Sequence, residues 1–104
     1  MIDVMQNVND RVVETIETLI HERMDQFGLS GVEVRPGEDH DGDPVIFVTA
    51  RYALTDRPIE PQAIFDLELS LRDKAWALGE RRFVHVLHKF DDAQKVARYR
   101  WSKA

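Results

Sequence analysis

The segment 38–43 reads Glu-Asp-His-Asp-Gly-Asp and is the densest cluster of side chains in this chain that can bind a cation or move a proton. Asp39, Asp41 and Asp43 alternate along it, and hard cations such as Ca²⁺ are held by several carboxylate oxygens. The EF-hand calcium loop, however, places its glycine later and adds a distant glutamate, which is missing here. Asp and Gly also close hairpin turns. We therefore expect a solvated hairpin loop, with a divalent-metal-dependent enzyme that uses these acids and His40 as the alternative.

Two further groups of polar side chains have spacings that could form a metal or acid–base site. His85 and His88 form a His-x-x-His pair, but residues three apart on a strand point to opposite faces and cannot share one metal. The second group lies along one face of the first expected helix and comprises Asp10, Glu14, Glu17 and His21. That face is opposite the apolar stripe of the helix, so we expect it to be solvated surface. We predict no catalytic residue, no metal and no cofactor.

Composition excludes or disfavours several classes of protein. The chain has no cysteine, which excludes disulfides, thiolate catalysis and cysteine-ligated zinc. It has no Gly-x-Ser-x-Gly turn, no Walker loop, no dinucleotide fingerprint and no His-Glu-x-x-His motif. No apolar run approaches the roughly 20 residues that span a bilayer, and the first residues lack the pattern of a signal peptide. We therefore expect a cytoplasmic protein without membrane contact.

Charge is distributed unevenly along the chain. Residues 1–80 contain 7 Lys/Arg and 17 Asp/Glu, whereas residues 81–104 contain 7 Lys/Arg and 2 Asp/Glu. An acidic body disfavours nucleic acid as a partner, because binding to phosphates depends on positive charge. The basic end can contact an acidic surface, either on this protein or on a partner.

The elements that position these groups follow from apolar periodicity and from stop signals such as Gly28 and Pro36-Gly37. The sequence predicts a helix over Val8–Phe27, strands over Val32–Arg35 and Val45–Tyr52, a helix from Pro61 to Gly79, a strand over Arg82–Phe90 and a short helix from Asp91 to Trp101. The first two strands form an antiparallel hairpin, and the second long helix returns the chain so that the third strand runs parallel to the second. The predicted fold is one α+β domain over residues 1–104, a two-layer sandwich of α-β-β-α-β order with a three-stranded mixed sheet. The expected core residues are Ile16, Leu19, Ile20, Ile46, Val48, Leu67, Leu71 and Val86.

This element order resembles the KH fold of the bacterial kind, an RNA-binding family that clamps RNA with a Gly-x-x-Gly loop between two helices. The chain has one such match, Gly28-Leu29-Ser30-Gly31, which falls between a helix and a strand. The resemblance covers element order, and no RNA-binding residue is carried over.

The second long helix has two apolar stripes, although a helix on the surface of a small domain needs only one. The stripe that suits the sheet comprises Ile64, Leu67, Leu71, Ala75 and Leu78. Phe65, Leu69 and Trp76 form the other stripe, rotated from the first by about 100–140°. This stripe either packs against the first helix or the C-terminal segment, or it is an exposed patch. With Arg72 beside it, an exposed patch has the composition of an interface hot spot.

These observations together favour a small protein-interaction module without catalytic activity, which binds another protein or itself through Phe65, Leu69, Arg72 and Trp76. The neutralising, antitoxin-like member of a two-gene pair is one form of such a module. The alternatives are the metal-dependent enzyme described above and an RNA-binding module. The RNA-binding module would use the basic C-terminal segment, with Tyr99 and Trp101 stacking on bases.

Overall fold

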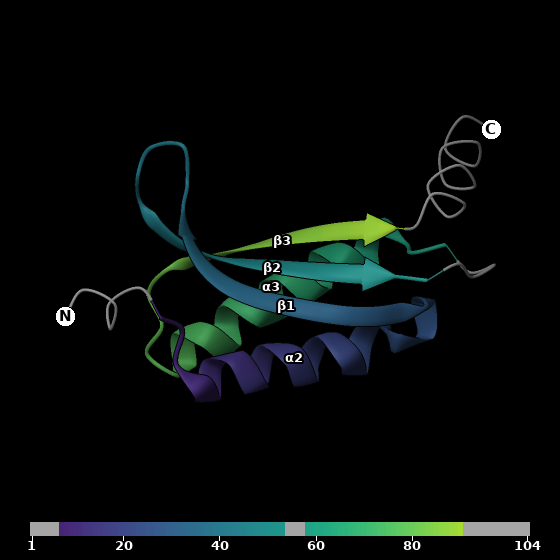
Figure 1. The fold of residues 1–104 in the computed structure, drawn as a ribbon. Helices are drawn as coiled ribbons and strands as arrows, with labels where there is room; N and C mark the ends of the chain where they lie inside the picture. The colour runs from purple at the N-terminus through teal and green to yellow at the C-terminus, as the bar shows by residue number, and fades with distance from the viewer. Residues whose placement is uncertain (1–6, 54–57, 91–104) are drawn as a thin grey trace.

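The structure is a computed structural model that describes residues 7–53 and 58–90. A three-stranded mixed sheet forms one layer of the molecule (Figure 1). Its strands are β1 (Leu29–Glu38), β2 (Pro44–Tyr52) and β3 (Phe83–Phe90), in the order β1-β2-β3. β1 runs antiparallel to β2, and β3 runs parallel to β2. The predicted α+β fold with α-β-β-α-β order is therefore confirmed. The predicted helix over Asp91–Trp101 lies outside the described residues.

Two helices form the other layer and cover one face of the sheet (Figure 1). α2 (Asp10–Met24) begins after Asn9, whose Oδ1 accepts a hydrogen bond from the Arg11 backbone N–H at 2.8 Å. It continues into a 3-10 turn, η1 (Asp25–Phe27), and stops at Gly28, which has the left-handed φ of 89° that favours glycine. The Gly-x-x-Gly match therefore ends this helix and starts β1, and does not form a loop between helices. Neither helix of the described residues is long and apolar enough to cross a membrane.

α3 (Pro61–Ala77) packs beside α2 and next to β3, whereas α2 lies next to β1. Its first position is Pro61, where the missing N–H removes no helical hydrogen bond. After the helix, Gly79 adopts a φ of 92°, and its N–H donates to the Trp76 carbonyl. The helix therefore ends two residues before the glycine that was predicted to stop it.

The extent of β1 differs from the prediction of a short strand that ends at Pro36-Gly37. Pairing with β2 continues through Pro36 and Gly37 to Glu38. β1 is an edge strand of this sheet, so one side of its backbone has no partner strand among the described residues. A proline is tolerated there, because its missing N–H can point away from the neighbouring strand. The hairpin arm is consequently longer than the sequence indicated.

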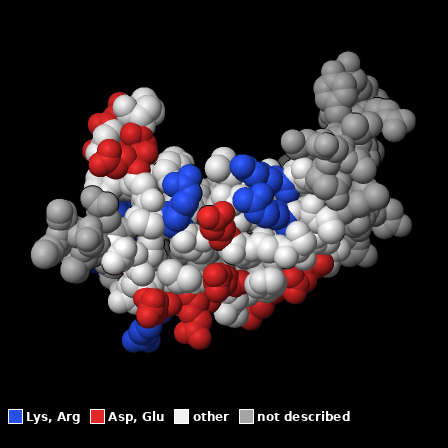
Figure 2. Space-filling view, in the orientation of Figure 1, with Lys and Arg blue, Asp and Glu red and all other residues white. Residues whose placement is uncertain are grey.

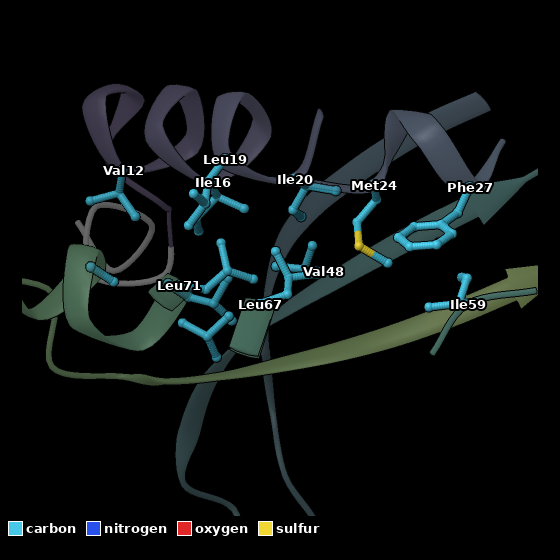
Figure 3. Packing of buried hydrophobic residues seen from close by; sticks show 14 of the residues in the cluster. Val12, Ile16, Leu19, Ile20, Met24, Phe27, Val48, Ile59, Leu67 and Leu71 are labelled. Atoms are coloured by element: carbon cyan, nitrogen blue, oxygen red, sulfur yellow. The ribbon is translucent and has the colours of Figure 1, made fainter. Parts of the chain in front are cut away.

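The hydrophobic core lies between the helices and the sheet (Figure 3). Its fully buried members include Ile16, Ile20, Ile46, Val48, Leu67 and Leu71, and Leu19 is also buried, as predicted. Val86 packs against this core but is only partly buried, because β3 is the second edge of the sheet. Met24, Phe27 and Ile59 close one end of the core (Figure 3).

Candidate protein-docking surface

The acidic loop 38–43 is a turn that its own first aspartate closes. The Asp39 carboxylate accepts hydrogen bonds from the backbone N–H groups of Asp41 and Asp43, at 2.9 and 3.0 Å. The bond from the Asp43 N–H, which favours the ionised form, lowers the pKa of Asp39. Gly42 supplies the turn with a φ of 85°. Asp39 is thereby committed to the loop backbone, as expected of a hairpin turn.

Within the described part of the chain, no group of three or more His, Asp or Glu side chains is arranged to hold a metal ion. His40 is exposed, and its nearest acidic partner is Asp41 at 3.6 Å. His21 is also on the surface, where its Nδ1 lies 2.9 Å from the Asp25 carboxylate. On the predicted polar face of α2, Asp10, Glu14 and His21 are exposed and Glu17 is partly buried. Glu14 also lines a shallow hollow between the helices, together with Lys74 of α3.

His85 and His88 lie on opposite faces of β3, as predicted. His85 is on the face away from the helices, where its ring centroid lies 4.6 Å from that of Phe83 and 5.7 Å from that of Phe47. His88 is on the helix-covered face, and its Nδ1 lies 2.8 Å from the Tyr52 hydroxyl. Each imidazole is held by its own neighbours, so the pair does not form one site.

The second apolar stripe of α3 is on the surface of the molecule. The exposed fractions of Phe65, Leu69 and Trp76 are 57%, 45% and 60%. The stripe does not pack against α2, because α3 turns another side to that helix, where Arg23 donates to the Ser70 hydroxyl at 3.1 Å. Residues 91–104, the other predicted cover for the stripe, lie outside the described residues. We name Phe65, Leu69, Arg72 and Trp76 the α3 stripe.

Two arginines fix side chains at one end of the α3 stripe. The Arg81 guanidinium carbon lies 3.8 Å from the Trp76 ring centre, and its Nη1 donates to the Trp76 carbonyl at 3.1 Å. Arg72 lies 4.2 Å from the Phe83 ring centre and 3.9 Å from a carboxylate oxygen of Glu68. Such cation–ring contacts restrict the rotamers of large side chains. The stripe therefore presents a partly ordered aromatic end, at a lower entropic cost on binding.

The surroundings of the α3 stripe are acidic. α2 with η1 contains five acids and two arginines, and α3 contains three acids and two bases, so the helical layer carries a net charge of −4. Asp66 and Asp73 flank the stripe, and neither forms an ion pair with another described residue. Acidic side chains are seen along the helical layer in Figure 2, whereas Lys and Arg gather over the sheet. An apolar line with an acidic border therefore runs along α3.

The sheet face away from the helices carries both exposed apolar side chains and arginines. Phe83 and Leu87 are 47% and 46% exposed there. Arg35 lies 4.8 Å from the centre of the Phe47 ring. The alternation along β2 showed that Arg51 and Phe47 share this face, but only the pairing register places residues of β1 and β3 beside them. Tyr99 and Trp101, named for an RNA-binding alternative, lie outside the described residues.

No model of a known protein family matches this chain, and no curated protein sequence matches it.

Proposed function

We propose that this protein is a non-catalytic interaction module that binds a basic partner protein through the α3 stripe. The observation that supports this proposal is the exposure of Phe65, Leu69 and Trp76 along one line of a helix whose other side forms the core. Single exposed apolar residues are common, whereas several large ones that line up on one helix are typical of binding surfaces.

The size of the α3 stripe indicates how much of the binding energy it can provide. Large apolar side chains bury about 150–250 Å² each, so three that are half exposed offer on the order of 300 Å². At about 25 cal/mol per Å², covering them contributes about 8 kcal/mol. Association costs about 4–15 kcal/mol in lost freedom of motion. The stripe therefore acts as a central anchor, and a stable complex also needs contacts at its charged border.

The acidic residues beside the α3 stripe favour a partner with a basic surface. Asp66 and Asp73 stand beside the stripe on a layer with a net charge of −4, so an approaching acidic surface is repelled and a basic one is attracted. A second copy that docked stripe against stripe in an antiparallel way would bring two such acidic borders together. A different, basic protein fits better, and an antitoxin-like role beside a basic neighbour is one instance of this function.

Leu69→Asp tests the proposal, with Leu87→Asp as a matched control. Both are leucines of nearly equal exposure, 45% and 46%, but Leu87 lies on the sheet. Each variant and the wild type are used as bait in a lysate of the source organism, and the protein that the wild type retains is purified and titrated calorimetrically. We expect Leu69→Asp to weaken its binding by tenfold or more, which is about 1.4 kcal/mol, and added salt to weaken wild-type binding. Leu87→Asp should bind normally.

Two results contradict the proposal. One is that each protein retained by the wild type is retained equally by Leu69→Asp. The other is that the purified partner is acidic and its affinity rises with salt. Circular dichroism of each variant is the control that a native fold is kept.

A further inference from the structure

The pairing registers arrange the face of the sheet away from the helices into rows that cross all three strands. On this face the side chains alternate with the core residues Ile46, Val48 and Ala50 of β2. From the hairpin end, the rows are Gly37–Val45–Phe83, Arg35–Phe47–His85, Glu33–Thr49–Leu87 and Gly31–Arg51–Lys89. We name this surface the open face.

The open face combines exposed apolar groups with charges of both signs. Phe83 and Leu87 are nearly half exposed, and Phe47, His85 and Phe83 form a continuous set of ring contacts across β2 and β3. Arg35, Arg51 and Lys89 outnumber Glu33, which lies 3.6 Å from Arg51. The face therefore has a net charge of +2, opposite in sign to the helical layer.

The acidic hairpin tip extends beyond the first row of the open face. Its four acids, Glu38, Asp39, Asp41 and Asp43, give it a net charge of −4 when His40 is neutral. The tip bends away from the helices (Figure 1) and rises as an acidic projection at one end of the sheet (Figure 2). The opposite end of the same face carries the row with Arg51 and Lys89. One end of the face is thus acidic and the other is basic.

We propose that the open face binds a second copy of this chain, with the two sheets face to face and their strands antiparallel. A two-fold axis across the strands, between the second and third rows, places Arg35 over Glu33 of the second copy and Phe83 over Lys89 of the second copy. Each acidic tip then reaches the Arg51 and Lys89 end of the other sheet. Packed sheets keep their strand directions within about 30°, so these row-on-row contacts are compatible with sheet packing.

Charge selects this orientation over the other two-fold arrangement. An axis along the strands would stack each row on its own copy and bring the two tips together, each with a net charge of −4. It would also place Arg35 over His85 of the second copy and leave the basic ends facing one another. The antiparallel arrangement instead pairs opposite charges at the centre and at both ends, as a self-complementary two-fold interface requires.

The open face alone is smaller than a standard interface, so the acidic hairpin tip has to contribute to the proposed dimer contact. Three strands about 4.8 Å apart and eight residues long, at about 3.3 Å per residue, cover roughly 400 Å². A standard interface buries about 800 Å² on each partner. The tip and the flanking long side chains must supply the remainder, so we expect a reversible dimer. The α3 stripe adjoins this surface where the Arg72 guanidinium lies over the Phe83 ring, but its apolar residues Phe65, Leu69 and Trp76 are not in the rows of the open face. The dimer does not depend on the function proposed above.

Sedimentation velocity over a range of protein concentrations tests the dimer. We expect the wild type to dimerise, Leu87→Asp to raise the dissociation constant by tenfold or more, and the matched variant Leu69→Asp to leave it unchanged. Arg35→Glu should also weaken the dimer, and the double variant Arg35→Glu/Glu33→Arg should restore it. A wild type that stays monomeric into the millimolar range overturns the proposal, as does a dimer that Leu69→Asp dissociates and Leu87→Asp does not.

Crosslinking tests the orientation, because the chain has no cysteine of its own. Phe83→Cys and Lys89→Cys are prepared separately and then mixed with a bismaleimide that spans about 10 Å, the distance between packed sheets. We expect a crosslinked dimer from the mixture and little from either variant alone, since six residues of strand separate like positions by about 20 Å. Crosslinking of each variant with itself, or none in the mixture, contradicts the antiparallel arrangement.

Discussion

Two leucines on opposite sides of α3 provide a direct stability test of which side forms the core. Leu71 is fully buried, whereas Leu69, two residues earlier, is 45% exposed. Leu71→Ala removes buried methyl groups and leaves a cavity in the hydrophobic core, which we expect to cost about 2–5 kcal/mol. Leu69→Ala leaves no cavity, and we expect a change within about 0.5 kcal/mol. A domain of this size is stable by about 5–15 kcal/mol, so the two variants should be clearly separated.

Urea unfolding followed by circular dichroism measures both changes on the same scale. We expect the midpoint of Leu71→Ala to fall well below that of the wild type with an unchanged slope, which indicates a loss of stability with no change in the surface exposed on unfolding. Leu69→Ala should overlay the wild type. Equal losses of 2 kcal/mol or more in both variants, a magnitude typical of core truncation, would mean that Leu69 is covered within the monomer. The account of the α3 stripe as a docking surface would then be refuted.

Three further predictions follow from single contacts. Glu80→Gln should cost about 1–2 kcal/mol at neutral pH, because the Glu80 carboxylate accepts a 2.8 Å hydrogen bond from the Arg82 side chain. That bond lowers the pKa of Glu80 below its ordinary value of 4.5, so the stabilisation is full above pH 4.5 and is lost as the pH falls through the lowered pKa. The free energies of unfolding of wild type and variant should therefore converge between pH 7 and pH 2, and a constant difference would contradict this. The triple variant Asp39→Asn/Asp41→Asn/Asp43→Asn should have a free energy of unfolding within about 0.5 kcal/mol of that of the wild type, with or without divalent ions. If calorimetry showed that the wild type binds calcium or magnesium and that these substitutions abolish the binding, the metal-site alternative would be restored. Gly37→Ala should destabilise the fold by about 1–3 kcal/mol, because a Cβ there would lie 2.5 Å from the Phe47 ring. Gly31→Ala is the control, because a Cβ there meets nothing within 4 Å. Equal melting temperatures of the two variants would argue against this placement of Phe47.

The elements that could be predicted from the sequence are those with a strong local signal. α2 has a regular apolar stripe, a capping asparagine and a stop glycine, and β2 is rich in β-branched and aromatic residues, so both were located closely. The end of β1 was wrong, because Pro36 and Gly37 break most strands and only its place at the sheet edge permits them to pair. Whether a proline is tolerated depends on the neighbouring strand, which local sequence does not show.

The candidate surfaces were predictable to different degrees for a related reason. Helical periodicity alone placed Phe65, Leu69 and Trp76 on one line. The packing of α3 excludes α2 as their cover, whereas residues 91–104, the other predicted cover, lie outside the described residues. The rows of the open face depend on the register between strands that are distant in sequence. Arg35 and Phe47 are neighbours only because β1 pairs with β2 in one particular register, which is set by the core packing on the other face.

Quenching of Trp76 fluorescence tests the central claim, the exposure of the α3 stripe, most directly. The chain has two tryptophans, so Trp101→Phe leaves Trp76 as the only reporter. Acrylamide quenching is measured at a concentration low enough for the protein to be monomeric, and then after the partner is added. With 60% of Trp76 exposed, we predict ready quenching and a red-shifted emission in the unbound protein, and protection in the complex. A blue-shifted Trp76 that is already protected in the monomer would contradict the claim, because the stripe would then be covered by the chain itself.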